Sequence, residues 1–285
     1  MNSSAQKLPH ILVVDPDPGV REIMKSQFVS QGWGIDHADD GPQGWERVQA
    51  THYDAVLLET RLPGTNGIDL LERIRETLPD IPVVLLVSES TSQDVVRALR
   101  GRAYGYLSKP VSELALADAV RRAIAVHDWS SDIEIISAIP EWISLQVRCK
   151  LEIVERLLPF IRGLEQDLAE QDREDGITAL REVLMNAIEH GGSCNPQKKV
   201  RVACVRTSRA IMYHVADPGP GFSFDRLPHA AISNPPDSPL GHHQVRSQMG
   251  IRPGGFGLLL TRSLVDEVIY NEAGNEVLII KYLVP

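Results

Sequence analysis

The chain has 285 residues, a formal net charge of −9 and a sequence pI near 5.5. Hydrophobic residues make up 43% of it and charged residues 24%, which is ordinary for a globular protein long enough for two domains. The acidic balance argues against binding nucleic acid or an anionic membrane through a basic surface. No apolar run approaches the roughly 18 residues of a membrane-spanning helix, and residues 1–10 lack a signal-peptide core. With three cysteines that show no metal spacing, we expect a cytoplasmic protein.

The first half alternates short apolar strands with amphipathic helices. The predicted strands cover residues 10–15, 33–38, 53–59, 82–88 and 104–110, and the predicted helices cover residues 18–31, 42–50, 67–78, 93–100 and 113–127. Repeated strand–helix units predict a parallel sheet with helices on both faces, and continuous Val/Leu runs suit strands buried on both sides. We therefore expect an α/β, doubly wound domain over residues 9–127, after a flexible tail of residues 1–8.

Chemically active residues follow these strands at one predicted edge of the sheet. Asp15 and Asp17 follow the first strand, while Glu59, Ser88 and Lys109 end the third, fourth and fifth. In open parallel sheets, ligands bind outside the carboxyl ends of the strands. Any one of these residues alone could be a solvated polar group at a strand end. Their convergence indicates a functional site.

This half resembles response-regulator receiver domains, which have a flavodoxin-like fold. The matching stretches are ILVVDPDPGVREIM, YDAVLLETRLPGTNGIDLL, VVLLVSES and YGYLSKPV. The resemblance implies that Glu59 stands at the phospho-acceptor position, which is normally an aspartate. It also implies that Ser88 and Tyr106 are the switch hydroxyl and the switch aromatic, and that Lys109 contacts the phosphate. The Lys109–Pro110 bond is a candidate cis peptide.

Two residues depart from the receiver pattern. Pro16 stands where a second acidic residue is usual and cannot bind Mg²⁺, which Asp17, one position further along, replaces only in part. Glu59 carries its carboxylate about 1.5 Å further out than aspartate would, which misplaces it for in-line attack. Its single charge imitates a phosphoryl group weakly, because that group carries about −1.5 to −2. We therefore expect a receiver that is not phosphorylated. An engineered Asp→Glu change would look the same at Glu59, but Pro16 favours natural degeneration.

A short polar linker over residues 128–132 leads into a second predicted domain over residues 133–285. Its predicted elements are a strand over residues 132–139, a long amphipathic helix over 142–169 kinked at Pro159, a charged turn over 170–176, a helix from Ile177, strands over 200–207 and 210–222, a polar segment over 223–253, a glycine-rich turn entering a helix over 254–268, and a terminal hairpin over 268–283.

Three ordered motifs carry the chemistry of this half. In the helix from Ile177, Glu182, Asn186 and His190 fall on one arc opposite an apolar stripe, although such a polar stripe is usually only a solvated face. Asp217 in DPGPGF offers a carboxylate to an adenine amino group. The GGFG turn then enters a helix, where free backbone N–H groups suit phosphates. Each motif alone is weak, but ExxxN, DxGxGF and GGxGL in this order are a strong signal.

This triple resembles the Bergerat (GHKL) ATP-binding fold, an α+β two-layer sandwich, and within it the anti-sigma-factor serine/threonine kinases. The end of the helix, EHGG, and the final stretch GGFGLLLTRSLVDEVIYNEAGNEVLIIKY are similar to theirs. The resemblance implies ATP and Mg²⁺ as cofactors and residues 223–253 as an ATP lid, longer than usual. It implies Asn186 as the residue that holds Mg²⁺, Asp217 as the adenine contact and Glu182 as the general base, which His190 could polarise unless it caps the helix. The implied pocket and phosphate residues are Gly219, Gly221, Arg252, Gly254, Gly255 and Gly257.

The expected function is an ATP-dependent protein serine/threonine kinase attached to a degenerate receiver. Its implied partner is a protein of the anti-anti-sigma or sigma-factor type, and homodimers are common in both families. Two alternatives stay open: an ATP-gated binding module without phosphotransfer, and a histidine-kinase-like two-component protein. Against the second, residues 142–169 contain no histidine that could accept a phosphoryl group.

Overall fold

The computed structural model describes residues 8–126, 129–222 and 257–283. The chain divides into two compact units, the first ending at Ser131 and the second beginning at Asp132. Within the described ranges, no helix is both long and apolar enough to cross a bilayer.

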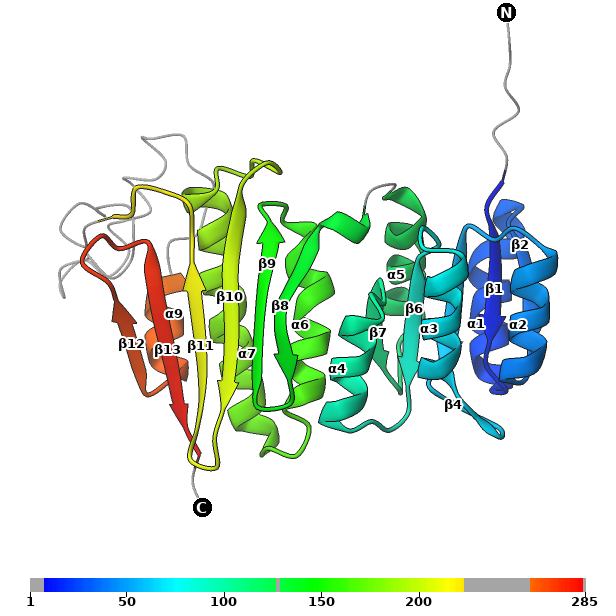
Figure 1. Cartoon of the computed structure of the whole chain (residues 1–285), viewed down its shortest axis with the longest axis horizontal. Helices are drawn as coiled ribbons and strands as arrows, with labels where there is room; N and C mark the ends of the chain where they lie inside the picture. The colour runs from blue at the N-terminus through cyan, green and yellow to red at the C-terminus, as the bar shows by residue number, and fades with distance from the viewer. Residues whose placement is uncertain (1–7, 127–128, 223–256, 284–285) are drawn as a thin grey trace, which may run out of the picture. The chain divides into compact units, whose positions relative to one another are not determined.

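The first unit is a doubly wound α/β domain, as the sequence predicts (Figure 1). Its five strands are parallel, in the order β2-β1-β3-β6-β7. They are β1 His10–Val14, β2 Gly34–Ala38, β3 Ala55–Glu59, β6 Val83–Val87 and β7 Gly105–Ser108. The helices are α1 Pro18–Phe28, α2 Gly41–Ala50, α3 Gly67–Thr77, α4 Ser92–Arg100 and α5 Glu113–Ala125, with a small ribbon of β4 Arg61–Leu62 and β5 Thr65–Asn66 and 3₁₀ turns η1 Val29–Gln31 and η2 Trp129–Ser131.

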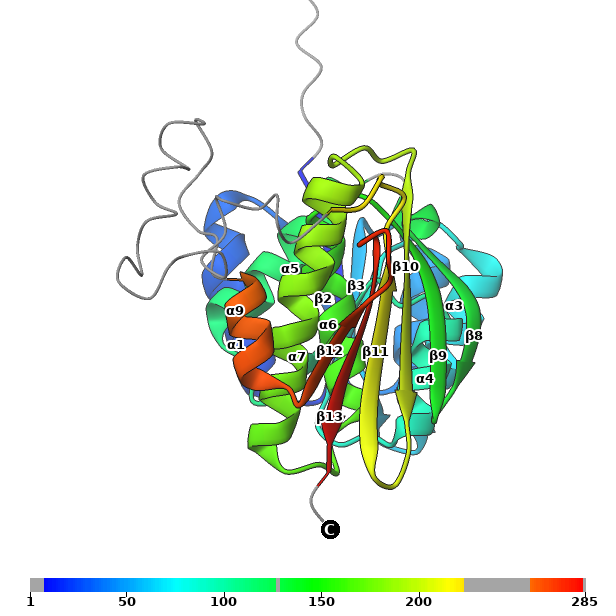
Figure 2. The same ribbon diagram turned by 90° about the vertical axis from the view of Figure 1, so that its left-hand side faces the viewer.

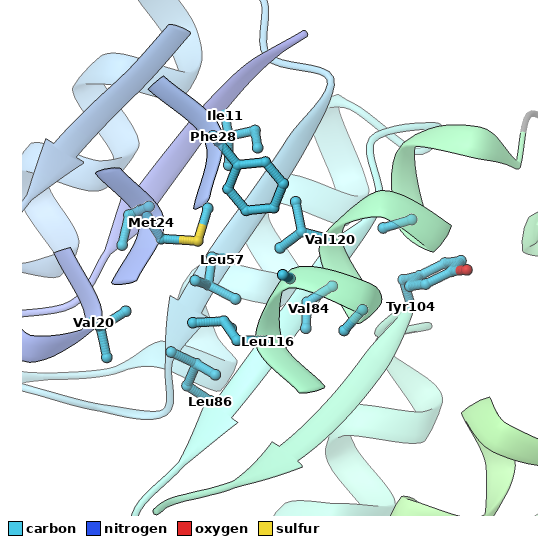
Figure 3. Packing of buried hydrophobic residues seen from close by; sticks show 14 of the residues in the cluster. Ile11, Val20, Met24, Phe28, Leu57, Val84, Leu86, Tyr104, Leu116 and Val120 are labelled. Carbon is cyan, nitrogen blue, oxygen red and sulfur yellow. The ribbon is translucent and has the colours of Figure 1, made fainter. Parts of the chain in front are cut away.

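Local sequence and core packing both fix these elements. Each helix of this unit begins after a side chain that accepts a backbone hydrogen bond, namely Asp17, Asp40, Asn66, Thr91 and Ser112. Figure 3 shows Met24 and Phe28 of α1 and Leu116 of α5 packed around Leu57 and Val84 of the sheet. All five side chains are at most 1% exposed. This core holds the strands whose carboxyl ends carry the polar residues.

The second unit is a two-layer α+β sandwich. Its sheet has the order β12-β13-β11-β10-β9-β8, and every pairing is antiparallel. Figures 1 and 2 show α6, α7 and α9 together on one face of this sheet. The strands are β8 Ile133–Ile139, β9 Trp142–Arg148, β10 Lys199–Arg206, β11 Ala210–Ala216, β12 Glu267–Tyr270 and β13 Glu276–Tyr282; the helices are α6 Glu152–Leu164, α7 Glu170–Asn186 and α9 Gly257–Leu264, with a π-helical turn over Ala187–Gly191.

The predicted helix over residues 142–169 is wrong in its first part, and also after Leu164, where α6 ends. Trp142–Arg148 is strand β9, which pairs with β8 and β10. The stretch WISLQVR alternates apolar and polar residues, and its apolar positions from Ile143 to Val147 are buried against the helices. A period of two is the strand pattern, and it decides against a helix here. The helix begins only at Glu152 and continues through Pro159.

The predicted charged turn over residues 170–176 is also wrong, because it forms the first turns of α7. Glu170 and Asp172 lie at the amino end of that helix, where negative charge interacts favourably with the helix dipole. Lys281 of β13 pairs with Asp175 at 3.3 Å and fixes this end of the helix to the sheet. The predicted terminal hairpin is confirmed as β12 and β13.

Candidate functional sites

The first unit brings Glu59, Asp15, Ser88 and Lys109 together at the carboxyl edge of its sheet. The Lys109 Nζ lies 2.7 Å from Glu59 Oε2 and 2.8 Å from Asp15 Oδ2. The Ser88 hydroxyl donates to Glu59 Oε2 at 3.1 Å. Glu59 is only 2% exposed and Asp15 is fully buried. The strand-end residues that the sequence predicts to converge therefore form one connected charge cluster.

One lysine balances two buried carboxylates in this cluster. Burial raises the pKa of Asp15, and the hydrogen bond from Lys109 opposes that rise. Burial works to lower the pKa of Lys109, but the hydrogen bonds to Asp15 and Glu59 outweigh it and leave that pKa raised. The ammonium group thus occupies the carboxylate oxygens that a cation would need. Over the described parts of the chain, no cluster of three or more His, Cys, Asp or Glu side chains could hold a metal ion.

Asp17 and Tyr106 lie at the margin of the cluster. The Asp17 carboxylate accepts the Gly19 N–H at 2.8 Å as the cap of α1, and it is 3.9 Å from the Lys109 ammonium. One oxygen of Asp17 is therefore engaged by the helix. The Tyr106 ring is buried, and its hydroxyl lies 2.5 Å from the Ser90 hydroxyl. The Lys109–Pro110 peptide is cis, as predicted.

In the second unit, α7 and the start of α9 bring Glu182, Asn186 and Gly257 together. A Cβ atom added at Gly257 would stand 2.7 Å from Glu182 Oε2 and 3.6 Å from Asn186 Nδ2. The backbone at Gly257 therefore faces both side chains directly. Glu182 is partly exposed. Among the described residues, Asn186 has no side-chain hydrogen-bond partner, so its amide oxygen is available to a hard cation.

Asp217 follows β11 and is held between two glycines. Its carboxylate accepts the Gly219 N–H at 2.7 Å, and its own N–H donates to the Asn275 carbonyl at 2.9 Å. A Cβ atom at Gly191 would stand 2.1 Å from Asp217 Oδ1, so only glycine allows this approach. Burial raises the pKa of Asp217, while the Gly219 hydrogen bond and the charge of Lys198 oppose the rise. The second carboxylate oxygen can accept a hydrogen bond from an amino group of a ligand. The nearby Gly221 packs on the Ala273 carbonyl.

A π-helical turn over Ala187–Gly191 follows α7 directly. His190 lies in this turn and is exposed. The same turn brings Gly191 against Asp217, where an added Cβ atom would stand 2.1 Å from the carboxylate oxygen Oδ1. The role predicted for His190 stays a prediction.

Several predicted features lie outside the described residues. They are the segment 223–253 that we interpret as an ATP lid, with Arg252 in it, Gly254, Gly255, residues 1–7 of the predicted tail and residue 128 of the predicted linker.

Comparisons with known proteins agree with this geometry. A family model for the response regulator receiver domain matches residues 11–121, and one for the histidine kinase-like ATPase domain matches residues 147–281. The chain therefore belongs to both families, with a receiver domain first and a kinase-like ATPase domain second. It is a signalling protein of the two-component type.

Several curated relatives are transcriptional regulators. The C4-dicarboxylate transport transcriptional regulatory protein DctD of Pseudomonas aeruginosa is 33% identical over 118 residues, 41% of this chain and 25% of that protein. The uncharacterized transcriptional regulatory protein YcbL of Bacillus subtilis is 30% identical over 153 residues, 48% of this chain and 67% of that one. A receiver domain protein of Methanospirillum hungatei has 22% identity and a TM-score of 0.40 over 42% of this chain and 95% of that one. The chain spans about a quarter of the length of DctD.

Proposed function

We propose that this protein is an ATP-dependent protein serine/threonine kinase of the anti-sigma-factor type, joined to a receiver held in one state. The observation that carries the proposal is the convergence of Glu182 and Asn186 on Gly257 at the start of α9. Asp217, held by Gly191 and Gly219, supplies the adenine contact. The amino end of a helix suits the phosphate groups of a nucleotide, and carboxylate and amide oxygens suit Mg²⁺.

Each residue has a definite task in this proposal. ATP with Mg²⁺ supplies the phosphoryl group when bound. Asn186 holds the cation through its amide oxygen. Asp217 orients the adenine ring of ATP by accepting a hydrogen bond from the adenine amino group. Glu182 accepts the proton from the hydroxyl of the protein substrate. Positioning contributes most of the catalysis in phosphoryl transfer, and a placed carboxylate adds to it.

The proposed protein substrate is a small partner of the anti-anti-sigma type that presents a serine or threonine. The support is the similarity of EHGG and of the final stretch from Gly257 to that kinase group. The absence of histidine from residues 142–169, which form β9 and α6, argues against autophosphorylation on this segment.

The test is transfer of labelled phosphate from ATP by the full chain to candidate partners encoded by neighbouring genes. We expect acid-stable label on the partner and a loss of about 100-fold or more with Glu182→Ala. Glu141→Ala is the matched control, because this exposed carboxylate lies in the β8–β9 turn. Acid-labile label would indicate the histidine kinase alternative. ATP binding without transfer, unchanged by Glu182→Ala, would support a nucleotide-gated binding module instead.

For the receiver, we propose that Glu59 replaces the phosphorylated residue permanently. The support is that Ser88 and Lys109, the partners that the family resemblance assigns to the phosphate, both bond Glu59 Oε2. A receiver fixed in this way holds one conformation for the kinase instead of switching.

A further inference from the structure

Arg181 lies on α7 immediately before the proposed base. Its Nε and Nη2 atoms donate to Glu155 Oε1 of α6 at 3.2 and 2.8 Å. Its Nη1 atom lies 3.9 Å from Glu182 Oε1. The Nε–Nη2 edge of the planar guanidinium group therefore contacts α6. Its Nη1 atom is left near the carboxylate of Glu182.

The Arg181–Glu155 pair is itself exposed, but Glu155 stands on a helix whose first turns are anchored by a buried ion pair. Glu155 precedes Arg156, which is only 8% exposed and bonds Asp132 Oδ2 at 3.0 Å. Asp132 is 2% exposed and also bonds the Lys150 ammonium at 2.7 Å. Breaking a buried ion pair of this kind is costly, so the first turns of α6 stay in place. Glu155 thus holds Arg181 from a fixed helix, which is the support that an oriented site needs.

The two oxygens of Glu182 face different neighbours. Oε1 faces the Arg181 guanidinium, and Oε2 faces the backbone of Gly257 at 2.7 Å from an added Cβ. A carboxylate whose first oxygen is drawn to a fixed cation keeps its second oxygen directed at the start of α9. The start of α9 is the side on which the proposed nucleotide site lies.

We propose that Arg181 is a positioning residue for Glu182, and that Glu155 holds it in place. The inference rests on the proposed function and adds to it the residue that orients the base. Within the described ranges, the ion pairs of Arg181 with Glu155 and Glu182 are well exposed to solvent or partly so, and such surface pairs contribute roughly 0–1 kcal/mol to stability. The role is therefore kinetic: a displacement of about 1 Å at a reacting group can slow a reaction by up to about 100-fold.

The experiment measures phosphate transfer by the full chain carrying Arg181→Gln, Arg181→Lys, Glu155→Gln or Glu182→Gln. We expect Arg181→Gln to lower kcat about tenfold, with the KM for ATP and the Tm unchanged. Arg181→Lys keeps the positive charge but loses the planar, forked donor group of the guanidinium, so we expect its kcat to lie between those of Arg181→Gln and the unaltered chain. Glu155→Gln should also lower kcat, but by less than Arg181→Gln does. The double variant should have nearly the same kcat as Arg181→Gln alone. Arg209→Gln is the matched control, because this arginine is exposed in the β10–β11 turn.

The outcomes separate the two proposals. A normal kcat in Arg181→Gln, together with a large loss in Glu182→Gln, overturns the role of Arg181 and leaves the proposed kinase intact. A fall in kcat that is accompanied by a clear fall in Tm in Arg181→Gln would show that Arg181 has a structural role, and this outcome would also overturn the inference. A normal kcat in Glu182→Gln overturns the assignment of the base itself.

Discussion

At the scale of single residues, Glu59 has all its acceptor capacity engaged. Its Oε1 accepts the Arg61 N–H at 2.9 Å and the Thr60 hydroxyl at 3.2 Å. Its Oε2 accepts the Ser88 hydroxyl and faces the Lys109 ammonium. A carboxylate oxygen bonded in this way is a poor nucleophile for a phosphodonor, and no approach is left open at a side chain that is 2% exposed.

We predict that the full chain stays unlabelled when it is incubated with acetyl phosphate and Mg²⁺. Glu59→Asp alone should also stay unlabelled, because Pro16 still leaves the cation without its second carboxylate. Glu59→Asp combined with Pro16→Asp should take up base-labile label, detected by the mass of the intact protein. Stoichiometric labelling of the unaltered chain contradicts the prediction. Labelling of Glu59→Asp alone would show that the missing acidic residue was never the barrier.

At the scale of elements, the sequence predicts a strand or a helix correctly where a single hydrophobic periodicity dominates the segment. The central strands β1, β3 and β6 are nearly continuous apolar runs, and each helix of the receiver starts at a capping side chain such as Asp40 or Thr91. It failed at β9, where a helical interpretation of a long amphipathic stretch overrode the alternation in WISLQVR. It also failed at the start of α7, because charged residues typical of a loop equally suit the first turn of a helix. The pairing of Arg181 with Glu155 of another helix depends on tertiary packing and has no sequence signal.

One buried acid links the end of α6 to the sheet of the second unit. Glu165 is 1% exposed, and its Oε1 accepts the Tyr213 hydroxyl at 2.6 Å. Its Oε2 is buried without a hydrogen-bond partner in the described structure. Burial raises the pKa of Glu165 to about 7, although Tyr213, Arg206, Cys204 and Arg173 act to lower it. The folded protein therefore carries a proton on Glu165 at a pH where the unfolded chain has lost it.

This predicts that stability falls as the pH rises from about 4.5 to about 7. The contribution is fully present below the ordinary pKa of the group and is lost as the pH passes through the raised one, with a size on the order of 3 kcal/mol. Glu165→Gln cannot ionise, so its free energy of unfolding should lack this component. Urea unfolding at pH 5 and at pH 7.5 measures it, with Glu170→Gln as an exposed control at the start of α7. Equal pH slopes for Glu165→Gln and the unaltered chain would contradict the assignment.

At the scale of the whole molecule, the joint between the units is anchored on both sides. In the first unit, Trp129 is 3% exposed, donates to the Asp80 carbonyl at 3.2 Å and packs edge-on against Tyr104. In the second unit, Asp132 is held by Lys150 and Arg156. The covalent connection between the two anchors is therefore only two residues long.

The first anchor also has a physical route to the Glu59 site. Strand β7 follows Tyr104, which touches Trp129, and ends just before Lys109, which binds Glu59. Loss of the charge at Glu59 removes one of the two buried carboxylates that hold Lys109, and Asp15 keeps the other contact. A shift of β7 would reach Trp129 at its other end, and through the two joint residues the start of the second unit. Such a route is established only by measured coupling between its two ends.

We therefore predict that Glu59→Gln changes kcat for phosphate transfer by about threefold or more, as expected for a coupling free energy of about 1 kcal/mol. The same substitution should have much less effect in a chain that also carries Trp129→Phe, which loses the hydrogen bond to Asp80. Trp45→Phe is the matched control, because Trp45 packs under Arg73 away from this route and should preserve the effect of Glu59→Gln. Four chains then form a double-mutant cycle, with circular dichroism to confirm that each is folded. Additive effects of Glu59→Gln and Trp129→Phe would show that the state of the receiver reaches the kinase-like ATPase domain by some path other than this joint.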